Sequence, residues 1–101
     1  MARIEALETA AKEARAAGNY AQAVLAYQSL LALNGGERVR ARGTRELGSV
    51  YMEMGDIELA AQQFKQVLRT FVSAEDKQIR SQVLWCSILM GDIKLAHQSL
   101  M

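Results

Sequence analysis

Few residues of this sequence are of a type that carries out covalent or metal chemistry. Cys86 is the single cysteine and His97 the single histidine, so a metal site or a catalytic triad lacks the side chains it needs. We expect His97 to lie at the surface, and Cys86 to be a small buried apolar residue rather than a reactive thiol. Gly35-Gly36 lacks the following Lys-Ser/Thr of a phosphate-binding loop. The sequence predicts no enzyme activity and no cofactor or metal.

The sequence contains residues suited to binding a partner, because three arginines recur at helical spacing. Arg38, Arg42 and Arg45 stand at i, i+4 and i+7 and share one face of a predicted helix. Guanidinium groups pair bidentately with carboxylates, so one interpretation is a binding site for an acidic segment of a partner protein. The alternative is a solvated face that Glu37, Glu46 and the acidic first helix partly neutralise.

Composition limits the remaining classes of function. Twelve Lys and Arg against eleven Asp and Glu give a net charge of +1. That balance disfavours a nucleic-acid-binding repeat using the arginines and the nearby Arg40. The first 17 residues are charged throughout, and no apolar run approaches the roughly 18 residues of a membrane span. With one cysteine, a reducing compartment is the simpler assumption. We therefore expect a cytoplasmic protein without membrane contact, folded as one domain over residues 1–101.

An internal repeat organises the chain. Three tripeptides, Gly18-Asn19-Tyr20, Gly55-Asp56-Ile57 and Gly91-Asp92-Ile93, have glycines 37 and 36 residues apart. An alanine follows five residues after each glycine, and a larger residue nine after it. The alanines and then the larger residues are Ala23, Ala60, Ala96, Tyr27, Phe64 and Leu100. These matches indicate a repeat protein, with copies over about 3–36, 37–73 and 74–101.

Each tripeptide predicts a tight turn between two helices. Glycine can take the left-handed conformation that ends a helix, and Asn or Asp can cap the next one. Asn19 with Gln22 resembles a capping box. Proline is absent and strong helix formers dominate. We expect six helices, over about 3–17, 20–34, 37–54, 57–72, 75–90 and 93–101.

The pattern resembles the tetratricopeptide repeat family, over about two and a half to three repeats. The second copy fits best, and its matching residues are Leu47, Gly48, Tyr51, Gly55, Asp56, Ala60, Phe64 and Leu68. The period is two or three residues longer than the family's usual 34, and the proline that usually ends the second helix is missing. The resemblance implies an all-α, right-handed superhelix of helical hairpins that serves as a scaffold for protein–protein contacts.

The resemblance also indicates where a partner would lie, along the groove that the first helix of each hairpin lines. Trp85 could be an aromatic anchor or a core residue, since Leu84 competes for the buried position. The asparagine of the family's carboxylate clamp is replaced by Thr9, Glu46 or Gln82, so we expect no such clamp. The predicted partner-binding residues are Arg38, Arg42, Arg45, Ser49, Met52, Gln78, Ser81, Trp85 and Ile88.

The end of the chain suggests a second function. The predicted sixth helix is short, and nothing follows to cover its apolar residues Ile93, Ala96 and Leu100. Either the chain is a piece of a longer array or these residues mediate self-association into a homo-oligomer. The leading functional prediction is a non-catalytic interaction module or adaptor that binds a peptide or helix in its groove. The alternative is an assembly element that self-associates through its last helix.

Overall fold

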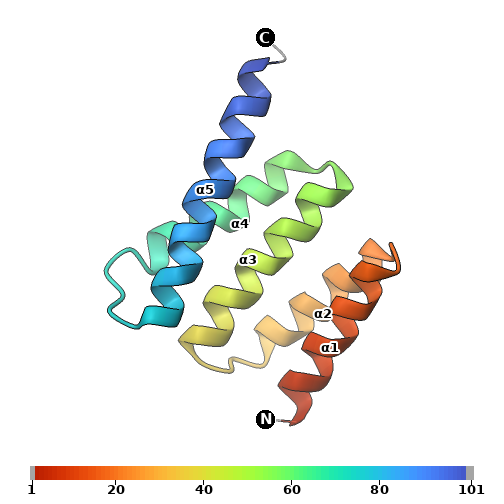
Figure 1. Ribbon diagram of the computed structural model, residues 1–101. Coiled ribbons are helices and arrows are strands. Elements are labelled where there is room, and N and C mark those ends of the chain that lie inside the picture. Colours follow the sequence, from red (N-terminus) through yellow and green to blue (C-terminus); the bar gives the residue numbers. More distant parts are fainter. Residues whose placement is uncertain (1, 100–101) are drawn as a thin grey trace.

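The computed structural model describes residues 2–99, and the side chains of residues 3–95, as an all-α fold (Figure 1). The elements are α1 (Ala2–Ala16), α2 (Tyr20–Ala32), α3 (Glu37–Met54), α4 (Ile57–Thr70) and α5 (Lys77–Ser99). Consecutive helices pack against each other in antiparallel hairpins, α1 with α2 and α3 with α4. The expectation of an all-α hairpin repeat is confirmed, whereas the expected number of helices is not.

Two of the three glycine turns form as the sequence predicts. Gly18 and Gly55 have φ angles of 79° and 86°, a left-handed conformation that a side chain would strain. The amide after each glycine donates to a carbonyl in the last turn of the preceding helix, as in Asp56 N to Tyr51 O at 2.9 Å. Asp56 also accepts from the Leu59 amide and caps α4. The capping box predicted at Asn19 is wrong, because the side chain of Asn19 makes no capping hydrogen bond.

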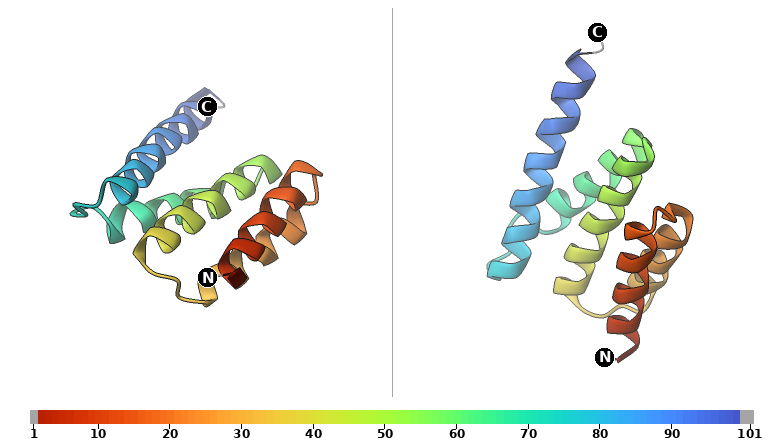
Figure 2. Two further views of the ribbon diagram at one scale, coloured as in Figure 1. Left: turned by 60° about the horizontal axis from the view of Figure 1, so that its bottom comes forward. Right: turned by 45° about the vertical axis from the view of Figure 1, so that its right-hand side comes forward.

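The third turn does not form, and this corrects the prediction of six helices. Gly91 and Asp92 lie inside α5, which continues without a break to Ser99. Gly91 has no left-handed φ, and Asp92 is an exposed residue of the helix rather than a cap. The segment expected to fold back from residue 93 onward instead extends α5 beyond the two hairpins (Figures 1 and 2).

Packing explains why α5 stays straight. Ile93 follows Ile79 and Cys86 at intervals of seven residues, so all three lie along one side of the helix, and all three are buried. In the complete hairpins the residue seven before the glycine is small, Ala11 or Gly48, and a Cβ added at Gly48 would lie 2.6 Å from Phe64 Cε1. The third copy has Leu84 at this position. A closing helix could not approach Leu84 as α4 approaches Gly48.

The core is divided between the two hairpins and α5. One cluster joins α1, α2 and α3 around Tyr27 and Val50, and the other joins α3, α4 and α5 around Phe64 and Cys86. The helices thus form two layers, with α1, α3 and α5 in one and α2 and α4 in the other (Figure 2). The shortest extent of the Cα atoms, 17 Å, fits two helical layers. No helix within residues 2–99 is long and apolar enough to cross a membrane.

Candidate partner-binding site

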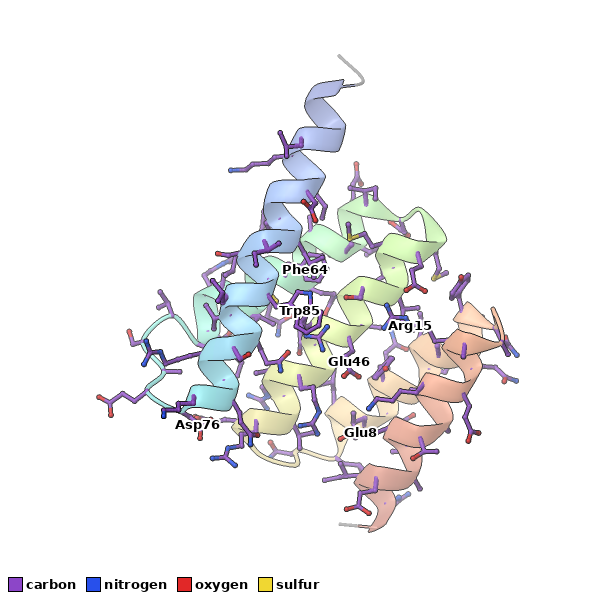
Figure 3. The ribbon with its side chains drawn as sticks, in the orientation of Figure 1. Glu8, Arg15, Glu46, Phe64, Asp76 and Trp85 are labelled. Carbon is purple, nitrogen blue, oxygen red and sulfur yellow. The ribbon has the colours of Figure 1, made fainter. Side chains whose placement is uncertain are left out.

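The first helices of the repeats line a hollow on one face of the molecule, and Figure 3 labels three of its residues, Arg15 on α1, Glu46 on α3 and Trp85 on α5. It has a volume of about 530 Å³ and takes residues from α1, α3 and α5. Its lining residues are Arg15, Arg45, Glu46, Ser49, Met52, Glu53, Trp85 and Leu89. Met52, Trp85 and Leu89 form the apolar part, and two arginines with two glutamates form the charged part. The hollow lies where the repeat pattern predicts a groove.

Trp85 and Arg45 form the contact between α5 and α3 in this hollow. The guanidinium carbon of Arg45 lies 4.2 Å from the centroid of the Trp85 ring, a cation–π geometry. Trp85 is 50% exposed whereas Arg45 is only 8% exposed. Arg45 also donates to Gln82 Oε1 on α5, and its Nη2 lies 3.4 Å from Glu46 Oε1. Burial lowers the pKa of Arg45, and the charge of Glu46 opposes that shift.

The other two arginines of the predicted basic face are also paired within the chain. Arg38 donates to Asp76 Oδ2 through Nε at 2.9 Å and through Nη2 at 2.7 Å. Arg42 donates to Glu8 Oε1. The three arginines therefore connect neighbouring repeats, and each already has an acceptor. The acceptors are Glu8, Asp76 and Glu46. Glu46 and the acidic first helix, which carries Glu8, were among the neutralising groups that the sequence suggested, whereas Asp76 was not.

A further ion pair closes the α1 side of the hollow. Arg15 donates to Glu53 Oε1, and the distance from Arg15 Nε to this oxygen is 2.9 Å. This hydrogen bond raises the pKa of Arg15. Beneath the hollow, Glu46 Oε2 and the Tyr27 hydroxyl are buried without a hydrogen-bond partner among the described side chains. Burial, and then the nearby Glu46 carboxylate, raise the pKa of Tyr27. Tyr27 of α2 and Glu46 of α3 are thus neighbouring buried polar residues between the first and second repeats.

Four of the five remaining predicted groove residues line one of two hollows. Ser49 and Met52 line the hollow. Ser81 and Ile88 lie instead on α5 with Leu84 and Trp85 around a second, shallower hollow of about 200 Å³. Gln78 is exposed and lines neither hollow.

The sequence left open whether Trp85 or Leu84 occupies a core position, and neither residue does. Leu84 is 64% exposed and Trp85 is half exposed. The residue that enters the core is their neighbour Cys86, which is fully buried. Burial raises the pKa of its thiol to about 11. Cys86 is therefore a buried apolar residue, as the sequence predicts.

The residues expected to mediate self-association do not form a described surface. Ile93 is 8% exposed and packs in the core cluster of α3, α4 and α5. Leu100 lies outside the described residues, as do the side chains of Ala96 and His97. The exposed apolar residues of α5 are Leu84, Trp85, Ile88 and Leu95.

Three residues of the site escaped the sequence analysis, namely Glu53, Asp76 and Leu89. For the two acidic residues, the sequence did contain a signal, namely their distance along the chain from an arginine. Glu53 follows Arg15 by 38 residues, and Asp76 follows Arg38 by 38 residues. This separation is close to the repeat period, and equivalent positions of stacked repeats lie side by side. Leu89 carried no such signal, because its place in the hollow depends on how α5 packs against α3. Among residues 3–95, no group of three or more His, Cys, Asp or Glu side chains could hold a metal ion.

The fold and the hollow together define the class of protein. Antiparallel helical hairpins are stacked side by side and their first helices line one face, which is the architecture of a helical repeat protein. The family model of the tetratricopeptide repeat matches residues 8–71, from the middle of α1 to the end of α4. The chain belongs to the tetratricopeptide repeat family. Repeats of this family are in general protein–protein interaction modules and typically not catalytic. No curated protein and no solved structure matches the chain.

Proposed function

We propose that the chain is a non-catalytic interaction module that binds a peptide or helix of a partner protein in the hollow between α1, α3 and α5. The observation that carries the proposal is the half-exposed Trp85, which stacks on Arg45 at 4.2 Å and lines, together with Met52 and Leu89, a hollow of about 530 Å³. A partly exposed tryptophan held in place by its neighbours loses little side-chain entropy on binding, which suits an interface anchor.

Charge decides which kind of partner side chain fits best. Arg15 and Arg45 face Glu53 and Glu46, so the charges around the hollow balance. An acidic segment would have to displace one of these carboxylates, or those that hold Arg38 and Arg42. An apolar side chain that covers Trp85 and Met52 displaces none of them. We therefore place an apolar anchor of the partner in the hollow and polar contacts along its rim.

The experiment selects peptides from a displayed random library against the immobilised chain and measures the affinity of the winners. Trp85 is the single tryptophan, so its fluorescence reports directly on occupancy of the hollow. Trp85→Ala should weaken binding about tenfold or more, as at an interface hot spot. Leu25→Ala, at an exposed leucine of α2, is the control and should leave affinity unchanged. If selected peptides bind the Trp85→Ala variant as tightly as the control, and leave the tryptophan emission of the native chain unaltered, the hollow is not the binding site.

A further inference from the structure

Arg45 is a charged residue that is almost completely buried beside the hollow, with 8% of its surface exposed. Among the described residues its ion pair is with Glu46, and the 3.4 Å from Nη2 to Oε1 is long for a charge-assisted hydrogen bond. Its Nε donates to Gln82 Oε1, a neutral acceptor on α5. Burying a charge is costly unless strong partners compensate it, and apolar residues of similar volume often replace buried ion pairs without loss of stability. Stability of the fold therefore does not account for an arginine here.

The repeat pattern does not require an arginine at this position either. Arg45 stands ten residues before the glycine of its repeat, and the positions ten before the other two glycines hold Glu8 and Ser81. The side chain at this position is therefore negative in the first copy, positive in the second and neutral in the third. The arginine is a feature of the second copy alone, and its particular contact is with Trp85 of the third copy.

That contact fixes the ring of Trp85 with one face open. The guanidinium carbon of Arg45 lies 4.2 Å from the ring centroid. A guanidinium at this distance covers the face beneath it, so the exposed half of Trp85 consists of the other face and the edges. Gln82, to which Arg45 also donates, stands three residues before Trp85 on the same side of α5. Arg45 therefore contacts α5 at two points and holds the ring in place.

The covered face determines which side chain the open face accepts. The face of an indole ring attracts cations because its π electrons give it a negative potential. At Trp85 one cation already uses this attraction, and it repels a second cation on the opposite face, since only the ring separates the two charges. The carboxylates of the hollow leave no net negative charge to offset the repulsion, because Arg15 and Arg45 balance them. An uncharged apolar side chain meets no such repulsion.

We propose that Arg45 is the specificity-determining residue of the hollow. By covering one face of Trp85, it makes the hollow accept an uncharged apolar side chain of the partner and disfavour lysine or arginine. Arg45 acts through the ring of Trp85 and does not need to touch the partner. The inference rests on the proposed function, because it states which side chain the hollow selects.

Two peptides that differ at one position measure this selectivity. One is a peptide selected against the hollow, with leucine at its anchor position, and the other carries lysine there. Titrations that follow the fluorescence of Trp85 give both dissociation constants. Arg45→Gln combined with Glu46→Gln removes one positive and one negative charge, so the net charge of the hollow stays the same. In this double variant the ratio of the lysine to the leucine dissociation constant should fall about tenfold relative to the native chain.

Arg38→Gln combined with Asp76→Asn is the matched control. It removes another ion pair of α3, and neither residue lines a hollow beside Trp85, so the ratio should keep its native value. Arg45→Gln alone, which retains Glu46, is a second neutral variant and should lower the ratio as well. Circular dichroism verifies that each variant is folded before titration. An unchanged ratio in a folded Arg45 variant, or an equal fall in the control, would overturn the proposal.

The leucine peptide separates a failure of this inference from a failure of the proposed function. Calorimetric titration compares its affinity for the native chain and for Trp85→Ala. If both bind it equally, the hollow is not the binding site, and the proposed function and this inference fail together. If binding depends on Trp85 but the ratio does not respond to Arg45, the hollow binds the peptide and only the role assigned to Arg45 is wrong.

Discussion

Gly48 shows how a single missing methyl group sets the distance between two helices. The residue lies beneath Phe64, whose ring is fully buried, and an added Cβ would lie 2.6 Å from one ring carbon. Phe64 is enclosed by its cluster and cannot move aside without displacing α4. The same comparison explains the third copy, where Leu84 replaces the small residue and no helix folds back.

We expect Gly48→Ala to lower the free energy of unfolding by about 1–3 kcal/mol, because overpacking outweighs the gain in helix propensity. Gly43→Ala is the control. Its Cβ would lie 3.0 Å from Leu31 Cδ2, at the end of a partly exposed side chain that can adjust. Urea unfolding of both variants measures the difference. Equal stability of the two variants would mean that Phe64 is not confined as described.

Asp76 combines two stabilising roles at the start of α5. It accepts from the Gln78 amide at 2.9 Å and from the Ile79 amide at 3.2 Å, and it pairs with Arg38 of the preceding repeat. Arg38, and then the Ile79 amide, lower the pKa of this carboxyl below its ordinary value of 3.8. A carboxyl with a lowered folded-state pKa stabilises the fold above its unfolded pKa and loses that contribution as the pH falls.

Asp76→Asn should therefore lower the thermal midpoint at neutral pH, since asparagine can still cap the helix but lacks the charge that pairs with Arg38. The gap between the native chain and the variant should shrink as the pH falls below 3.8 through the folded-state pKa of Asp76. Circular dichroism melts from pH 7 to about 2 measure this gap. A gap that stays constant over this range would show that the charge of Asp76 contributes nothing.

At the scale of the elements, one motif has two outcomes. Gly55 ends α3 with a φ of 86°, whereas Gly91 at the equivalent position stays inside α5. The turn forms where Phe64 nine residues later can settle on Gly48, and the helix continues where Ile93 can join Ile79 and Cys86. The local motif permits both conformations, and the contacts of the following residues select one of them.

The same substitution should consequently have opposite effects at the two positions. Gly55→Ala should destabilise by about 1 kcal/mol, because alanine is strained at a positive φ. Gly91→Ala should stabilise the fold by up to about 1 kcal/mol, because the residue is helical and its Cβ would meet no atom within 4 Å. Thermal unfolding measures both. Destabilisation by Gly91→Ala would indicate that the third turn forms in solution.

At the scale of the whole molecule, charged pairs between repeats set how the first helices are arranged. Arg42 with Glu8 and Arg15 with Glu53 join α1 to α3, and Arg38 with Asp76 joins α3 to the start of α5. These side chains line or border the proposed binding face, so the pairs that hold the repeats together also fix the shape of the hollow. Arg45 extends the connection to Trp85 itself.

A double-mutant cycle on Glu8→Gln and Arg42→Met should give a coupling free energy of about 0.2–1 kcal/mol. Both side chains are partly exposed, at 15% and 31%, so added salt should reduce the coupling. Urea unfolding of the four proteins at low and high salt measures it. Additive effects of the two substitutions would show that the pair does not stabilise the repeat stack.

The sequence by itself determined the fold class and the positions of the two complete hairpins. Helix propensity, the glycine turns and the small-to-large pairs such as Ala60 with Phe64 are local or repeat-spaced features, and they can be read without coordinates. The resemblance to the tetratricopeptide repeat family named Ser49, Met52 and Trp85 as groove residues, and all three line the hollow.

Only the tertiary structure decided whether the third turn forms and whether the three arginines are paired within the chain. Whether Gly91 bends depends on Ile93 finding a place beside α4, a contact that no local pattern encodes. Whether Arg38, Arg42 and Arg45 are free depends on acceptors 34 to 38 residues away, which stacking alone brings within reach. In both cases the competing local states differ little in free energy, so contacts between distant segments determine the outcome.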